Sequence, residues 1–62
     1  MNIRIEINTD NDAFTDNESQ ETCRILHELI DRIYRYSHFS PDHCQLLRDY
    51  NGNTVGRFDI LE

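Results

Sequence analysis

The chain has 62 residues, 37% of them hydrophobic, and its 12 acidic side chains against 6 basic ones give a formal charge of −6. This length allows a single small domain, residues 1–62, with little room for a catalytic cleft. The negative charge disfavours direct contact with nucleic acid, whose phosphates it repels. No stretch approaches the roughly 18 consecutive apolar residues that cross a membrane, and the alternating N-terminus is unlike a signal peptide. We therefore expect a cytoplasmic protein that contacts neither nucleic acid nor a membrane.

The basic and thiol side chains exclude some chemistry. All six basic residues are arginines, so no lysine can form a Schiff base or anchor a phosphate. The two cysteines, Cys23 and Cys44, are expected to be free thiols, because structural disulfides are rare in a reducing compartment.

The first predicted element is a strand over residues 2–8. Ile3, Ile5 and Ile7 alternate with Arg4 and Glu6, which is the period-2 pattern of a half-buried strand. The polar residues 9–12 that follow favour a turn.

The second predicted element is a helix over residues 18–37, which ends before Pro41. Apolar side chains recur along one face at three- and four-residue spacing, and charged side chains line the opposite face. The apolar positions are Cys23, Leu26, Ile30 and Ile33, and the stripe is widened on the same side by Ile25, Leu29 and Tyr36. Two N-caps compete at its start: Thr15 paired with Glu18, or Asn17 paired with Gln20.

The last third of the chain predicts a hairpin around residues 50–52. A three-residue loop with Gly52 in the left-handed region pairs Leu46 with Gly56 and Cys44 with Phe58. This register places Leu47 and Val55 on the opposite face of the sheet. A short second helix that begins at residues 40–41 is the alternative.

These elements predict an α+β fold of β-α-β-β order, in which one helix packs on one face of a three-stranded antiparallel sheet of strand order 1-3-2. Leu47 and Val55 would then lie on the uncovered face, and the first and second strands would be unpaired edges. This arrangement suggests a symmetric homodimer through the open face or an edge. In the alternative, Arg4, Glu6 and Arg57 screen the two apolar side chains and the chain stays monomeric.

An acidic stretch without any basic residue links the first strand to the helix. Its spacing resembles a calcium loop, but Phe14 and Thr15 stand where a ligand and a glycine are needed, so we expect no calcium. Two interpretations remain: the carboxylates cap the helix, or they form a surface for a basic partner, in one version by mimicking DNA. The candidate partner-binding residues are Asp10, Asp12, Asp16, Glu18 and Glu21.

Five thiol and imidazole side chains could in principle bind zinc, but their spacing fits no zinc module. His43 and Cys44 are adjacent on a strand and point to opposite faces, so the first cannot activate the second. We therefore expect no metal, no cofactor and no catalytic residue. The alternative function, in which these side chains do bind a metal ion, is a small metal-binding module. The residues concerned are Cys23, His27, His38, His43 and Cys44.

Three segments, IEINTDN (5–11), RIL (24–26) and LRDYNGNTVG (47–56), resemble a family of short acidic proteins carried by bacteriophages and mobile elements. The resemblance implies an accessory protein in the cytoplasm of a bacterial host. Such a protein would act by binding and modulating a host protein, host defence proteins included. The resemblance is weakest over residues 36–43, so it implies no role for them.

Overall fold

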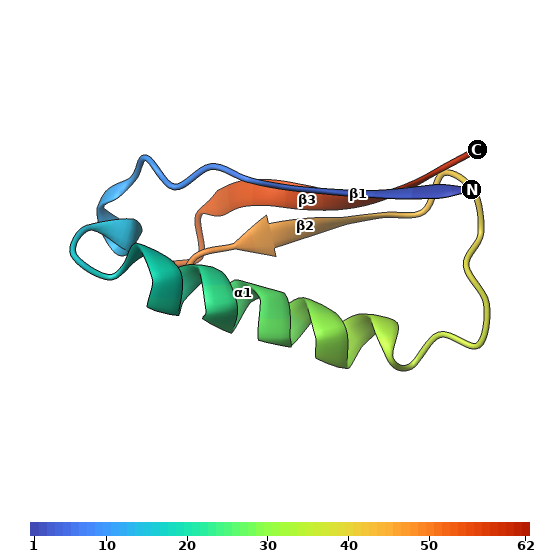
Figure 1. Cartoon of the computed structure of the whole chain (residues 1–62), viewed down its shortest axis with the longest axis horizontal. Coiled ribbons are helices and arrows are strands. Elements are labelled where there is room, and N and C mark those ends of the chain that lie inside the picture. Colours follow the sequence, from blue (N-terminus) through green and yellow to red (C-terminus); the bar gives the residue numbers. More distant parts are fainter.

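The computed structural model describes all 62 residues and has two layers, a sheet and a helix (Figure 1). In chain order the elements are β1 (Asn2–Ile7), a 3-10 turn η1 (Asp12–Phe14), α1 (Glu18–Ile33), β2 (Cys44–Arg48) and β3 (Thr54–Leu61). The strands form an antiparallel sheet of order β1-β3-β2, and the helix lies along one face. The predicted α+β class and strand order are confirmed.

The β2–β3 hairpin closes as predicted at its loop. Gly52 has a φ of 87°, its N–H donates to the Asp49 carbonyl over 3.0 Å, and Arg48 pairs with Thr54. One residue further along, the register shifts, so that Leu47 pairs with Gly56. Val55 is therefore the extra residue of a β-bulge in β3. The alternative second helix does not form, since β2 is a strand from Cys44 onwards.

The bulge overturns the predicted faces of the hairpin, because a one-residue slip in register moves every side chain of a strand to the other face. Leu47 and Val55 are 1% and 8% exposed and belong to the core. They therefore do not form the apolar patch that was predicted on the open face. Cys44 and Leu46, predicted to be covered by the helix, are exposed instead.

The core lies between the helix and the sheet. Phe14 and Phe58 are fully buried at its centre, and Phe14 comes from η1, inside the acidic stretch. This phenylalanine therefore anchors the connection between β1 and α1. The complete core consists of Ala13, Phe14, Ile25, Leu29, Leu47, Val55, Phe58 and Ile60.

The helix begins where predicted and ends earlier. Asn17 is its N-cap residue, but no side-chain hydrogen bond caps it, so neither predicted capping pair forms. The helix ends at Ile33 rather than at residue 37, and the chain then turns and packs Tyr36 against His43. Their ring centroids are 4.8 Å apart, and the Tyr36 hydroxyl lies 2.8 Å from His43 Nε2. With 16 residues and several charges, α1 is neither long nor apolar enough to span a bilayer.

The helix covers β2 and β3 more than β1. Arg32 donates to the Leu46 carbonyl over 3.2 Å, and Arg24 donates to the Arg48 carbonyl over 3.1 Å, so the helix is held toward β2. On β1, Ile3 and Ile5 stay 52% and 45% exposed. The isoleucine face of β1, predicted to be the buried side of a half-buried strand, is therefore not buried at these two residues.

Gly56 is the position that we expect to tolerate a side chain least. A Cβ there would collide with the backbone carbonyl oxygen of Glu6 on β1. Gly56→Ala should lower the free energy of unfolding by about 1–3 kcal/mol, measured by urea denaturation, because the two strands must separate to make room. Gly52→Asn is the control and should cost less than about 1 kcal/mol, since nothing lies within 4 Å and Asn tolerates positive φ. Equal losses in the two variants would contradict the close-approach argument.

Candidate interaction surface

Four of the five acidic residues predicted to bind a partner are exposed, and we call this set the acidic end: Asp10, Asp12, Asp16 and Glu18. It surrounds η1 and the start of α1, at the end of the molecule opposite the chain termini (Figure 1). None of its carboxylates takes part in an ion pair or a side-chain hydrogen bond within the protein. Their charge is therefore available to a partner.

Asparagine side chains, rather than these carboxylates, make the hydrogen bonds at the turns before the helix. The side chain of Asn11 accepts a hydrogen bond from the Ala13 N–H over 2.9 Å and so caps η1. The side-chain amide of Asn17 lies 2.9 Å from the Thr15 carbonyl oxygen, at the turn before the helix. Asparagines thus serve the turns, while Asp12 and Glu18 contribute only charge to the first turns that they begin.

Glu21, the fifth predicted partner-binding residue, is not on the surface. It is 4% exposed and accepts two hydrogen bonds from Arg24, each 2.8 Å long. It also accepts one from the Tyr50 N–H over 2.9 Å, which joins the helix to the hairpin loop. The prediction is wrong here because Glu21 falls on the helix side that faces the loop, where a buried charge requires a partner.

Asp49 is a buried residue that the sequence reasoning missed. Its carboxylate accepts hydrogen bonds from the N–H groups of Asn51 and Asn53, both over 2.9 Å, and from the Asn11 side chain over 2.8 Å. It thereby fixes the hairpin loop and ties it to the turn before η1. The available signal was an Asp directly before a tight turn, a position where its side chain bonds to nearby backbone.

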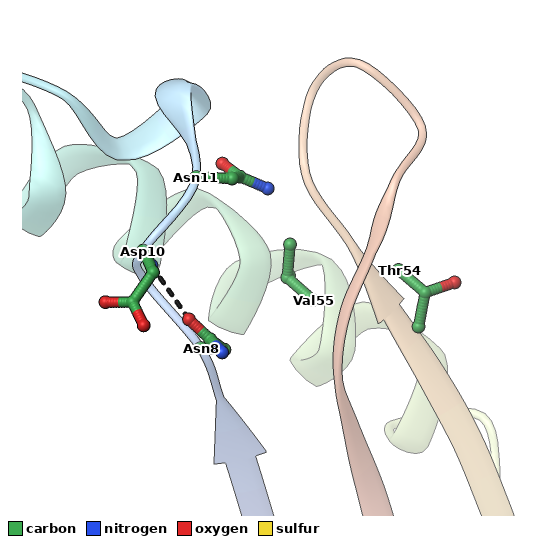
Figure 2. A pocket seen from close by; sticks show the side chains of 5 residues that line it. All are labelled: Asn8, Asp10, Asn11, Thr54 and Val55. Atoms are coloured by element: carbon green, nitrogen blue, oxygen red, sulfur yellow. Dashed lines mark hydrogen bonds between the residues drawn. The ribbon is translucent and has the colours of Figure 1, made fainter.

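A shallow polar depression lies between the acidic end and the hairpin (Figure 2). Four polar side chains and Val55 line it, and Figure 2 shows the Asp10 carboxylate pointing away from Val55. Asp10 is held in place by a 2.8 Å hydrogen bond from its N–H to the Asn8 side chain. The depression therefore extends the polar surface of this end and brings no nucleophile and base together. Its lining residues are Asn8, Asp10, Asn11, Thr54 and Val55.

The open face of the sheet carries a third buried carboxylate, Asp59. Its oxygens lie 2.9 Å from Arg57, two residues earlier on β3, and 3.4 Å from Arg4, directly opposite on β1. Arg57 in turn lies 3.4 Å from the Cys44 sulfur. Ion pairs therefore occupy the open face of the sheet, where the apolar Leu47 and Val55 were predicted.

The thiol and imidazole side chains do not converge. Both cysteines are exposed, and no group of three or more His, Cys, Asp or Glu side chains is arranged to hold a metal ion. His43 is half-buried and bonded to Tyr36, whereas His27 and His38 are exposed. Cys23, predicted to lie on the buried stripe of the helix, lies outside it, since that stripe is centred on Ile25 and Leu29.

Three carboxyl groups have lowered pKa values. Hydrogen bonds from Arg24 lower the pKa of Glu21, and those from Arg57 lower the pKa of Asp59, in each case against the opposing effect of burial. Burial pulls the pKa of Asp49 upward, but the hydrogen bonds from Asn53, Asn11 and Asn51 together outweigh it and lower the pKa. All three are therefore held ionised in the folded protein.

Comparisons with protein-family models, with curated proteins and with solved structures find no match for this chain.

The lowered pKa values predict how stability depends on pH. A carboxyl group with a lower pKa in the folded state stabilises the fold fully above its unfolded pKa, and this contribution is lost as pH falls through the folded pKa. The ordinary values are 4.5 for Glu21 and 3.8 for the two aspartates. We expect the free energy of unfolding to be nearly constant from neutral pH to about pH 5 and to fall at lower pH.

Glu21→Gln tests this assignment. The variant should be less stable than the wild type at neutral pH, and its stability should fall less steeply in acid, measured by urea denaturation at a series of pH values. Glu18→Gln, which removes an exposed carboxylate outside any ion pair, is the control and should keep the wild-type slope. An unchanged slope in Glu21→Gln would contradict the role given to this residue.

Proposed function

We propose that this chain is a small accessory protein of a bacteriophage or mobile element, acts in the host cytoplasm and functions by binding a host protein. The resemblance of three segments to short acidic phage proteins supports the setting. The observation that carries the binding function is the acidic end, where four exposed carboxylates have no cation within the protein. A binding role also agrees with the composition of the acidic end, which contains carboxylates and no nucleophile paired with a base.

The chemistry of the acidic end favours a partner with a basic surface. Unpaired carboxylates raise the association rate with a positively charged protein and fix its orientation, and both effects weaken with salt. Arginine- or lysine-rich grooves have this character, and nucleic-acid-binding proteins commonly carry them. A host defence protein with such a groove is the partner that fits the proposal best.

Mimicry of DNA is the second candidate, and the same exposed carboxylates favour it. A mimic occupies the groove that binds phosphates, so its partner would be unable to bind DNA at the same time. Binding to a basic surface elsewhere on the partner would leave DNA binding intact. Competition with double-stranded DNA therefore separates the two candidates.

The test of the proposed function is capture of a host protein by the wild-type chain, followed by measurement of affinity for the captured protein with charge-neutral variants. Asp10→Asn, Asp12→Asn, Asp16→Asn and Glu18→Gln combined remove four negative charges, which takes the formal charge from −6 to −2. We expect at least a tenfold loss of affinity, because each lost ion pair is worth several tenths of a kcal/mol or more.

A matched control removes four other exposed carboxylates, through Glu28→Gln, Asp31→Asn, Asp42→Asn and Glu62→Gln, and reaches the same formal charge. This control should keep the wild-type affinity. Equal losses in the two variants would show that only net charge matters and would overturn the assignment of the acidic end. Unfolding curves of both variants confirm that the fold is retained.

A further inference from the structure

The two edges of the sheet differ, and β1 has the open one. The Asn8 N–H donates to the Val55 carbonyl, whereas the Ile60 N–H donates to the His43 carbonyl and the Ile60 carbonyl accepts from the Asp42 N–H, both directly before β2. Because hydrogen-bonding direction alternates along antiparallel strands, the even-numbered residues of β1 bond to β3. The N–H and carbonyl groups of Ile3, Ile5 and Ile7 therefore point away from β3, to the side where β1 has no neighbouring strand.

The β2 edge is covered by the helix. By the same alternation the outward carbonyls of β2 belong to Cys44, Leu46 and Arg48, and the last two each accept a hydrogen bond from an arginine of α1, as described above. Covering an edge in this way blocks its pairing with another strand. The chain thus protects one edge and leaves the other with three unpaired donors and three unpaired acceptors, on Ile3, Ile5 and Ile7.

The side chains of β1 are self-complementary about Ile5. In the sequence NIRIEIN (2–8), an antiparallel partner strand of the same sequence, centred on Ile5, places Ile5 opposite Ile5 and Ile3 opposite Ile7. On the other face it places Arg4 opposite Glu6, twice by symmetry. Directly opposite side chains in antiparallel strands are neighbours, so both the apolar contacts and the ion pairs form together.

Other registers lack this match. A register centred on Arg4 places two Arg4 side chains opposite each other, which repels. A register that differs by one residue sets isoleucines against charged side chains and sends half of the isoleucines to the wrong face. The register centred on Ile5 is thus selected by charge and by apolar contact at once.

We propose that β1 pairs antiparallel with β1 of a second copy of this chain, in the register centred on Ile5, to form a two-fold symmetric dimer. The dimer joins two three-stranded sheets into one continuous sheet with the helices on the same face. The exposed parts of Ile3 and Ile5, next to the unpaired edge, then contact the isoleucines of the other copy. The surface is separate from the acidic end, so the dimer and the proposed host partner are independent of each other.

The first experiment is sedimentation equilibrium of the full chain over a concentration series up to about 1 mM. The wild type should rise from 7.4 kDa toward twice that mass. Ile5→Pro should remain a monomer, because proline removes an outward N–H at the centre of the interface while the bonds to β3 persist. Proline is tolerated at edge-strand positions whose N–H faces solvent.

Leu46→Pro is the matched control for this variant. Leu46 is 46% exposed, against 45% for Ile5, and its N–H faces outward on the protected β2 edge. It should dimerise like the wild type. A wild type that stays monomeric at every concentration, or an Ile5→Pro variant that keeps its fold and still dimerises, would overturn the proposal.

The second experiment needs no proline and relies on charge. Arg4→Glu places glutamates at both positions 4 and 6, and Glu6→Arg places arginines at both, so each variant alone repels its own copy and should dimerise at least tenfold more weakly than the wild type. Mixed in equal amounts, the two variants restore both ion pairs and should form a heterodimer, measured by native mass spectrometry. Because Arg4 also pairs with the buried Asp59, unfolding curves first establish that each variant is folded. A mixture of folded variants that stays monomeric while the wild type dimerises would assign the dimer to another surface and refute this one.

Discussion

The close approach of β1 to Gly56 is the constraint on which the rest of the structure depends. A side chain at this position would meet the Glu6 carbonyl, so β3 passes β1 here without one. The bulge beside Gly56 shifts β2 by one residue, and that shift sends Leu47 into the core and Leu46 to the opposite face. The placement of the helix follows, because the outward carbonyls of the shifted β2 are those that the arginines of α1 bind.

Arginine side chains of the helix connect its carboxylates to the backbone of the sheet. Arg24 bonds to Glu21, to Glu28 and to the backbone of β2, so one guanidinium joins the buried charge of the helix to an edge of the sheet. Glu21 in turn holds the hairpin loop through Tyr50. The chain therefore uses part of its acidic surplus internally, in contacts that join the helix to the sheet and to the hairpin loop.

Local patterns in the sequence were enough to predict the elements and their order. The alternation of Ile3, Ile5 and Ile7 predicted the first strand, and Gly52 predicted the loop of the hairpin, because both signals are local. The bulge escaped prediction, since turn rules describe the hairpin loop and not the pairing beyond it; an isolated glycine within a strand was the available hint. Of the five acidic residues proposed for a partner surface, Asp10, Asp12, Asp16 and Glu18 are exposed as that proposal requires. The burial of Glu21 could not be predicted, because it depends on the hairpin loop that packs against the helix.

The central place of β3 has a consequence for how the chain folds during synthesis. Both other strands pair only with β3, which is the last element in chain order, and Asn2 pairs with Leu61. No strand can find its partner before residues 54–61 have been made, so the sheet forms late and closes long loops when it does. Until then the apolar β1 stays unpaired on the nascent chain, where it is exposed to chaperones and to other newly made strands.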